Sequence, residues 1–296
     1  MTNKKGTELW QGQMPELQGA WFGQALPGLK AVEFCPRLFD AKHRVAGITF
    51  GPKGDEAFFS LNTPDSASSD IMWTRVHEGI WTKPQPAPFN STEIDNDICM
   101  APSGRRVVWR SWRPLPGNTK PEDVVSLWAV DRTAGGWGEP FPVECGGERQ
   151  QAVYPGISLS GTLYFSVQAA NGEHIVARAR RNGQQYEARE TIIPRTSPGG
   201  DLCVAPDESF LVITVYNQPK GGTRTGSLHA SFRNPDETWT APQDLGLAVN
   251  AETTEYCPTI SADGKWLFFC HLHREDGVVR AHARWIDTHV IGRLRA

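Results

Sequence analysis

The sequence predicts an all-β fold, a single β-propeller, and three observations support this class. A hairpin pattern occurs five times: a short apolar run, a turn with Gly or Asp, and a run rich in β-branched and aromatic residues. The equivalent turn residues are 50, 57, 47 and 56 positions apart, close to the period of propeller blades, about 40–50 residues. No helical 3.6-residue apolar pattern of useful length competes with this pattern.

The five predicted hairpins follow one another along most of the chain. They read GITFGPKGDEAFFSL from Gly47, DICMAPSGRRVVWRS from Asp97, YPGISLSGTLYFSV from Tyr154, DLCVAPDESFLVIT from Asp201 and CPTISADGKWLFFC from Cys257. The residues taken as equivalent are Gly51, Ala101, Ser158, Ala205 and Ser261.

A second unit follows each hairpin, alternates in polarity, turns and reaches an aromatic residue. The copies read DIMWTRVHEGIWTKP, SLWAVDRTAGGWGEP, HIVARARRNGQQYEA, SLHASFRNPDETWTAP and RAHARWIDTHVIGRL. Trp81, Trp137 and Trp239 each precede a proline by three positions, and we interpret them as packing residues between blades. Each repeat therefore predicts about four strands.

The domain organisation follows from these repeats. We expect residues 41–296 to form a propeller of five blades, each with four antiparallel strands. Residues 1–40 lack the hairpin, and we expect them to wrap the outside or to add a strand that closes the ring. Closure matters because an open edge strand invites aggregation. The alternative is six blades, if residues 9–40 form a blade of their own.

Composition excludes several classes of function. Thirty Lys and Arg against 33 Asp and Glu give a net charge of −3, so no nucleic-acid partner is expected. No apolar run approaches the roughly 18 residues of a membrane span, so no such span is expected. The six cysteines lack the C-x-x-C spacing of zinc ribbons and thioredoxins.

The hairpins also carry a family resemblance. CPTISADGKWLFF, VAPDESFLVI, GTLYFS, GGWGEP and TWTAPQDLGLAVN resemble the TolB-like β-propellers, a WD-like repeat family with Ser-Pro-Asp-Gly hairpins. Residues 51–54 and 158–161 depart from that hairpin pattern. The resemblance implies a propeller that binds or scaffolds, usually in the periplasm or outside the cell. The N-terminus MTNKKGTELWQGQ has no apolar signal region, so the chain as written predicts a cytoplasmic protein.

Polar residues from distant positions are expected to meet at one end of the central channel. In a propeller, the start of each inner strand and the end of the next strand lie on the same face. This rule predicts a site that binds a small molecule, a glycan or a peptide at the channel mouth. The predicted ligand-binding residues are His43, Arg110, Tyr154, Tyr216 and Glu255.

A metal-assisted hydrolase of an ester, lactone or phosphoester is the alternative function. His271 and His273 are two positions apart on one strand and therefore point to one face. With Asp201 and Glu255 they would hold a divalent metal, calcium or zinc. The predicted catalytic residues are His271, Asp97 and Arg113, with Arg113 facing the developing negative charge.

Simpler structural roles remain open for most of these residues. His271 and His273 fit a solvated rim. Asp97 and Asp201 fit acceptors of backbone N–H groups where a loop enters a strand. Arg110 and Arg113 fit either pairs with neighbouring acids or a clamp on an anionic ligand.

The cysteines also have a simple structural interpretation. Cys99 and Cys203 fit small buried apolar residues. A two-residue turn at Asp263 and Gly264 places Cys257 opposite Cys270, which predicts packed thiols, with a disulfide as the alternative.

Overall fold

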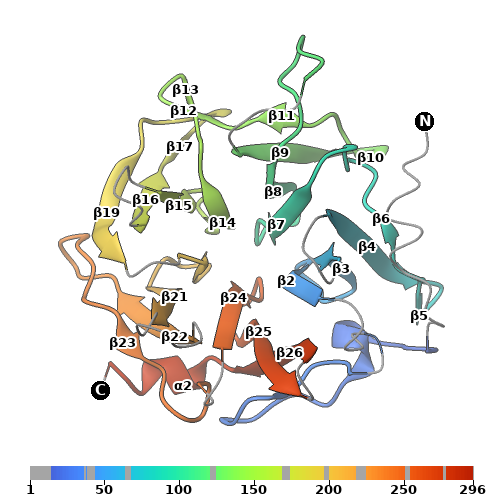
Figure 1. Cartoon of the computed structure of the whole chain (residues 1–296), viewed down its shortest axis with the longest axis vertical. Helices are drawn as coiled ribbons and strands as arrows, with labels where there is room; N and C mark the ends of the chain where they lie inside the picture. Colours follow the sequence, from blue (N-terminus) through green and yellow to red (C-terminus); the bar gives the residue numbers. More distant parts are fainter. Residues whose placement is uncertain are drawn as a thin grey trace.

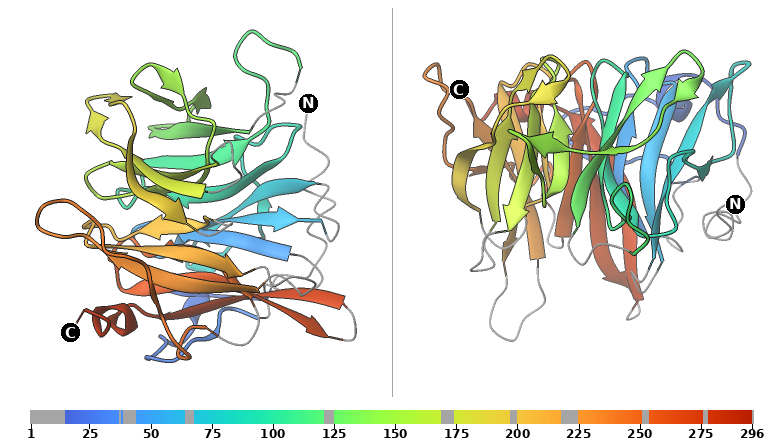
Figure 2. Two further views of the ribbon diagram at one scale, coloured as in Figure 1. Left: turned by 60° about the vertical axis from the view of Figure 1, so that its left-hand side comes forward. Right: turned by 90° about the horizontal axis from the view of Figure 1, so that it is seen from above.

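Strands arranged radially around a central axis make up the computed structural model of this chain (Figure 1; Figure 2). The structure describes residues 15–36, 38, 44–63, 68–120, 125–168, 174–196, 200–217, 225–250, 254–275 and 278–295. Nearly all regular structure in these residues is β, and the fold is a β-propeller. In this described part, neither short helix has the length or apolarity to cross a membrane.

Five inner strands surround the axis and contact one another in a closed cycle. They are β2 (Arg44–Phe50), β7 (Asp95–Met100), β14 (Val153–Ile157), β20 (Leu202–Val204) and β24 (Thr254–Ile260). Each contacts the next, and β24 contacts β2. We call each inner strand, with the strands that follow it outward, a blade, and therefore interpret the molecule as five blades.

Blades 1 and 2 share one order: the first three strands run outward along the chain, and the two short strands that follow both pair with the third. Blade 1 continues with β3 (Glu56–Asn62), β4 (Ser69–His77), β5 (Ile80–Trp81) and β6 (Gln85–Pro86). Blade 2 continues with β8 (Arg106–Ser111), β9 (Ser126–Thr133), β10 (Gly136–Trp137) and β11 (Phe141–Pro142).

Blade 3 carries a small extra sheet, formed by one strand pair that precedes its inner strand and one pair between its last two strands. The blade continues with β15 (Leu163–Gln168), β16 (His174–Ala179) and β19 (Glu190–Thr196). The extra sheet contains β12 (Glu144–Cys145), β13 (Glu148–Arg149), β17 (Arg181–Asn182) and β18 (Gln185–Tyr186).

Blades 4 and 5 are joined into one sheet by a parallel contact between Gly226 and Thr254. Blade 4 continues with β21 (Phe210–Asn217), β22 (Thr225–Phe232) and β23 (Gln243–Asp244). Blade 5 continues with β25 (Trp266–Glu275) and β26 (Val278–Asp287). The last repeat ends in a short helix, α2 (His289–Gly292), where the sequence pattern predicted another turn and strand.

The N-terminal segment supplies the outer strand of blade 5. Its strand β1 (Val32–Glu33) pairs antiparallel with β26, with Val32 opposite Trp285 and Glu33 opposite Arg284. In residues 15–36 and 38 the only other element is a single turn, η1 (Ala20–Gly23). The described part of this segment therefore adds a strand to an existing blade, and it contains no strands for a sixth blade.

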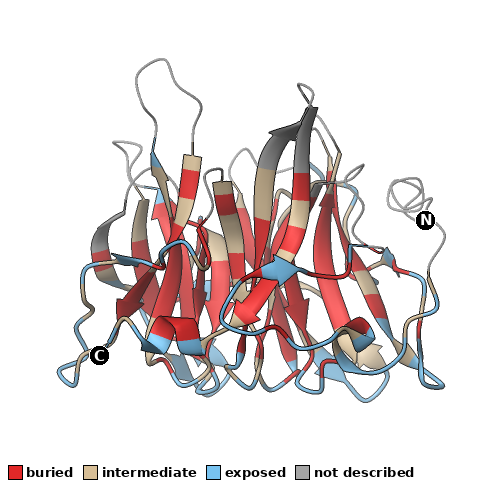
Figure 3. Cartoon of the chain, turned by 90° about the horizontal axis from the view of Figure 1, so that it is seen from below, coloured by how far each residue is buried: buried red, intermediate tan, exposed pale blue. Residues whose placement is uncertain are grey.

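The apolar core runs through the blades, while exposed residues gather in the connecting loops (Figure 3). Aromatic side chains fill the space between blades 1 and 5, where Phe34 from the N-terminal segment is fully buried against Phe268 and Trp285. Trp81, Trp137 and Trp239, predicted as packing residues, all lie in or against core clusters.

A β-bulge interrupts the first strand pair in four of the blades. The register shifts between Ala46 and Thr49, Asn96 and Cys99, Val153 and Gly156, and Tyr256 and Thr259. The backbone is left-handed at Asp97, Tyr154 and Cys257, with φ of 54°, 52° and 49°. At the equivalent place in blade 1 stands Gly47, with φ of 58°, a conformation that glycine adopts without strain.

The bulge in blade 5 changes the predicted pairing of the cysteines. Thr259 lies opposite Phe268, but Tyr256, and not Cys257 as predicted, lies opposite Cys270. The prediction was wrong because a bulge inserts one residue that a regular ladder does not contain. All six cysteines are free thiols, and Cys203 is buried as expected. Cys99 is partly buried and lines a narrow cavity of about 20 Å³ on the axis.

Candidate functional site

A cavity of about 390 Å³ lies at the end of the axis where the inner strands begin. All five blades contribute to its wall, as the propeller rule predicted. Its lining residues are Ala46, Asn62, Ser69, Ile94, Asn96, Asp97, Arg110, Trp112, Tyr154, Asp201, Tyr216, Thr254, Tyr256, Cys257 and Leu272.

Equivalent residues of the five inner strands form a ring across the base of this cavity. They are Gly47, Asp97, Tyr154, Asp201 and Cys257, each four positions before the turn residue of its hairpin. Four of them line both the main cavity and a smaller one of about 20 Å³ further along the axis. A bulge redirects the side chain that it carries, so the bulges of blades 2, 3 and 5 bring the side chains of Asp97, Tyr154 and Cys257 to the axis. We call this set the axial ring.

Asp97 forms an ion pair with Arg110 at the cavity wall. The Arg110 Nε atom lies 2.8 Å from Oδ2 of Asp97, and it also donates to Oδ1 of Asn96. The Arg110 guanidinium lies over the rings of Trp112 and Tyr154, 5.2 and 5.5 Å from their centroids. Burial raises the pKa of Asp97 to about 6, opposed by the charge of Arg110 and assisted by Asp201.

Asp201 faces the same cavity from blade 4 and is 1% exposed. Its Oδ2 accepts from the backbone N–H of Cys257 at 2.9 Å and from the hydroxyl of Tyr216 at 3.2 Å. The first bond fits the simpler interpretation, because Asp201 satisfies an amide that the bulge frees from the ladder. The second oxygen, Oδ1, has no hydrogen-bond partner among the described residues.

The phenol and the thiol of the axial ring both stay protonated. The charge of Asp201, together with burial, raises the pKa of Tyr154 well above its usual value. Burial, together with the charges of Asp201 and Asp97, likewise raises the pKa of Cys257. The Tyr154 hydroxyl therefore keeps a proton that it can donate to a ligand, and Cys257 is a neutral thiol that lacks the thiolate character of a nucleophile.

Glu255 and His271 come together as predicted but do not line the cavity. The Nδ1 atom of His271 lies 2.8 Å from Oε1 of Glu255, and the two residues are opposite each other in β24 and β25. Successive side chains of a strand point to opposite faces. The cavity is lined by Thr254, Tyr256 and Leu272. Glu255 and His271 therefore lie on the other face of the sheet.

The structure also places Arg113 away from the cavity wall. Its guanidinium donates to Asp95 Oδ1 at 2.9 Å and lies over the rings of Trp109 and Trp128. Asp95 is fully buried and also accepts from Trp109. Of the two interpretations of Arg113, the pair with a neighbouring acid therefore agrees with the geometry. His43 and the side chain of His273 lie outside the described residues.

The predicted metal ligands are not assembled into one described cluster. Across the residues that the structure describes, no three His, Cys, Asp or Glu side chains are placed to hold a metal ion. Asp201 lines the cavity, whereas Glu255 and His271 pair on the other face of their sheet. Asp201 therefore lies apart from the pair of Glu255 and His271, and the metal site stays a prediction.

Sequence reasoning missed Trp112 and Tyr256, two aromatic residues of the cavity wall. Trp112 follows the end of β8, and Tyr256 directly precedes the bulge at Cys257. The bulge shifts the alternation of side chains, so no periodic pattern assigns Tyr256 to the cavity. The available signal was position: Asn96 and Tyr256 both stand five residues before the turn residue of their hairpins.

No known family profile matches this sequence, and no curated protein matches it either. Solved propeller structures do match the fold. A TolB candidate from Agrobacterium tumefaciens superposes with a TM-score of 0.53 at 10% identity, over 86% of this chain and 96% of that chain. A candidate glycoside hydrolase from Bacteroides ovatus gives a TM-score of 0.51 at 12% identity, over 92% and 96%. At such low identity the similarity establishes the fold alone, and this chain is a β-propeller.

Proposed function

We propose that this protein is a TolB-like propeller that binds a neutral sugar, free or as a unit of a glycan, in the central cavity. One observation carries the proposal: three non-glycine residues adopt left-handed backbone at the same place in three blades, and all three line the cavity. Each such residue costs about 1–3 kcal/mol, and strain of this kind clusters at functional sites. The hairpin sequences and the similarity to the TolB candidate support the TolB-like assignment.

The size of the cavity favours a small ligand. Its volume of about 390 Å³ is near the lower end of small-molecule sites, roughly 300–1,000 Å³. The smaller cavities beyond the axial ring measure about 20 Å³, which leaves no room for a ligand to pass along the axis. A mono- or disaccharide fits this space, whereas a folded polypeptide segment does not.

The chemistry of the wall favours a neutral, hydroxyl-rich ligand. Asn62, Asn96 and Thr254 offer both donors and acceptors, and Asp201 retains an unused acceptor oxygen. Trp112, Tyr216 and Tyr256 add aromatic surface on which the apolar face of a sugar ring can pack. Asp97 neutralises Arg110, so an anionic ligand would meet the uncompensated charge of Asp201.

The first experiment is a titration of the protein with a panel of neutral sugars and the matching uronic acids. The panel contains glucose, galactose, xylose, arabinose and their common disaccharides. Intrinsic fluorescence is a direct readout, because Trp112 lies in the cavity wall. We expect saturable quenching by at least one neutral sugar, and weaker binding of its uronic acid.

Trp112→Ala is the variant that tests the site, and Trp73→Ala is its control. Both tryptophans are partly buried, but Trp73 lies in β4 of blade 1 and not in the cavity wall. We expect Trp112→Ala to weaken binding, measured by calorimetry, about tenfold or more, which corresponds to about 1.4 kcal/mol. A panel without saturable binding, or equal losses in the two variants, would contradict the proposal.

Hydrolysis of a glycosidic bond is the second candidate function. Two carboxylates, Asp97 and Asp201, share one cavity, and the pKa of Asp97 is raised to about 6. Acid–base hydrolysis of glycosides needs one protonated and one ionised carboxyl group. Nitrophenyl glycosides of the sugar that binds provide the test: Asp97→Asn and Asp201→Asn should each abolish release of nitrophenol, and Asp97→Asn should still bind the sugar. If the wild type bound the sugar but released no nitrophenol, hydrolysis would be contradicted and sugar binding alone would remain.

A further inference from the structure

A second cavity, of about 380 Å³, lies between blades 2 and 3 at the hairpin ends of their inner strands. Arg106 at the start of β8 lines this cavity, whereas Arg110 in the same strand lines the central one. The two cavities therefore occupy opposite ends of the blades. The lining residues are Ala101, Ser103, Arg105, Arg106, Asp131, Arg132, Ile157, Ser158, Leu159, Ser160, Gly161, Arg181, Gln184 and Tyr186.

Two of the four arginines in this wall are neutralised. Arg106 binds Asp131 through two hydrogen bonds, from Nε at 2.6 Å and from the second terminal nitrogen at 2.7 Å. Arg132 pairs with Glu56 of blade 1 and lies over the ring of Trp137. These pairs hold the two guanidiniums in place and use up the nearby carboxylates.

The other two arginines keep their charge. Arg105 is exposed, and its guanidinium has no partner among the described residues. Arg181 is exposed, and among the described residues it donates only to neutral oxygens, the carbonyl of Gly183 and the amide oxygen of Gln184. A methyl group at Gly161 would lie 2.9 Å from Cδ of Arg181, so the stem of Arg181 packs closely on the blade 3 turn.

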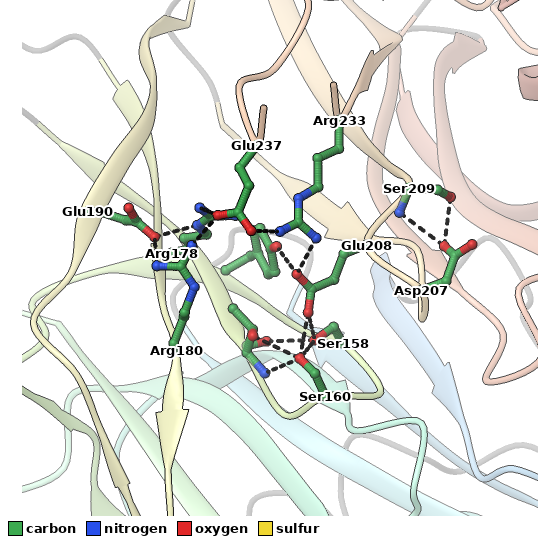
Figure 4. Close-up of polar contacts among 12 residues, drawn as sticks. Ser158, Ser160, Arg178, Arg180, Glu190, Asp207, Glu208, Ser209, Arg233 and Glu237 are labelled. Carbon is green, nitrogen blue, oxygen red and sulfur yellow. Dashed lines mark hydrogen bonds and ion pairs between the residues drawn. The ribbon is translucent and has the colours of Figure 1, made fainter. Parts of the chain in front are cut away.

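The remaining carboxylate near this wall is also satisfied. Glu208 of blade 4 accepts from Ser158 and Ser160 and pairs with Arg233 (Figure 4). Ser158 and Ser160 direct their protons to Glu208 and away from the cavity. The unused donors of the wall are therefore Arg105, Arg181, the hydroxyl of Ser103 and the amide nitrogen of Gln184.

We propose that this cavity is an anion site that binds the phosphate or sulfate group of a small ester. Two positive charges and two neutral donors face one concave space, and among the described lining residues the one carboxylate, Asp131, is paired with Arg106. Guanidinium groups match the oxygens of phosphate and sulfate with paired hydrogen bonds. The exposed side chain of Leu159 at the same wall offers apolar contact to the organic part of the ester.

Calorimetric titration with inorganic phosphate, sulfate and acetate at constant low ionic strength tests this proposal. Low ionic strength is needed because salt screens exposed charges. We expect one saturable site for phosphate and sulfate, and at least tenfold weaker binding of acetate. Equal affinity for acetate, or no saturable heat with phosphate and sulfate, would overturn the proposal.

Arg105→Ala and Arg181→Ala assign the site, and Arg189→Ala is the control. All three arginines are exposed, but Arg189 does not line the cavity. Each of the first two variants should weaken phosphate binding about tenfold, the loss expected for one charge-assisted hydrogen bond. If Arg189→Ala weakened phosphate binding equally, the effect would come from general surface charge, which would contradict the proposed anion site. Trp112→Ala should leave phosphate binding unchanged, which separates this result from the proposed sugar site.

Discussion

Asp97 binds its proton more tightly in the folded chain than in the unfolded chain. Burial raises its pKa from 3.8 to about 6. Between these two values the native state holds a proton that the unfolded state has released, so the free energy of unfolding falls as pH rises. The loss amounts to about 3 kcal/mol, and it is nearly complete above about pH 7.

Asp97→Asn removes this titration and tests it directly. An amide cannot ionise, so the variant should gain about 3 kcal/mol relative to the wild type between pH 4 and pH 7.5. Urea unfolding of both proteins at pH 4, 5.5 and 7.5 measures the difference. Stability curves that run parallel over this range would show that Asp97 keeps an ordinary pKa.

The axial ring also explains two similar stretches of sequence, NDICMAPSG and GDLCVAPDE. Asp97 and Asp201 occupy the same ring position in blades 2 and 4, and Cys99 and Cys203 follow two residues later beside the narrow cavity. The repetition alone is structural, because both stretches are inner hairpins. The side chains at the ring position differ from blade to blade, and these differences make the site.

Among the structural elements, the hairpin turn of blade 4 is fastened to blade 3 by one carboxylate. Glu208 has φ of 62° and accepts from Ser158, from Tyr164 at 2.8 Å and from Arg233 at 3.2 Å (Figure 4). Burial acts to raise its pKa, but hydrogen bonds from Ser160, Ser158 and Tyr164 hold it below the usual value. The ionised carboxylate therefore stabilises the contact between the two blades.

Glu208→Gln should cost about 2–4 kcal/mol at pH 7, because it leaves buried donors and Arg233 without their charged acceptor. The defect should shrink as pH falls below the usual pKa of Glu, where the wild type also loses the charge. Chemical denaturation at pH 7 and pH 3 measures both effects. Asp207→Asn is the control, because Asp207 is exposed and, within the described part of the chain, bonds only to Ser209 of its own turn. A cost no larger than that of the control would contradict the fastening role.

The elements themselves were largely predictable from the sequence, and the exceptions have local causes. All five hairpins lie where the pattern of Gly, Asp and alternating residues placed them. The predicted pairing of Cys257 with Cys270 was wrong because β24 contains a bulge. A bulge depends on the contact between blades, and the two-residue alternation of a strand sequence does not reveal it. The sides of Glu255 and His271 were missed for the same reason, since one inserted residue exchanges the two faces.

At the scale of the whole molecule, the propeller class followed from repetition, and the missing hairpin in residues 1–40 suggested a wrapping or ring-closing segment. The place where its strand pairs did not follow from any repeat. The strand β1 has only two residues, Val32 and Glu33, too few for a periodic signal. Its position depends on the edge of blade 5 and on a pocket that receives Phe34. Such contacts between distant parts of the chain cannot be predicted from sequence patterns, because they depend on the shapes of surfaces that the folded blades create.

Phe34 therefore tests closure of the ring. It is fully buried and contacts Phe50 of blade 1 and Phe268 and Trp285 of blade 5, with ring centroids 5.7, 5.1 and 5.0 Å away. Phe34→Ala should reduce the free energy of unfolding by about 3–5 kcal/mol, through lost burial and a cavity between the first and last blades. Leu26→Ala is the control from the same segment, because Leu26 is 60% exposed and should change stability by about 0.5 kcal/mol or less. Thermal and urea unfolding of the three proteins measure the difference. Equal stability of the two variants would show that the N-terminal segment merely lies on a ring that the blades close without it.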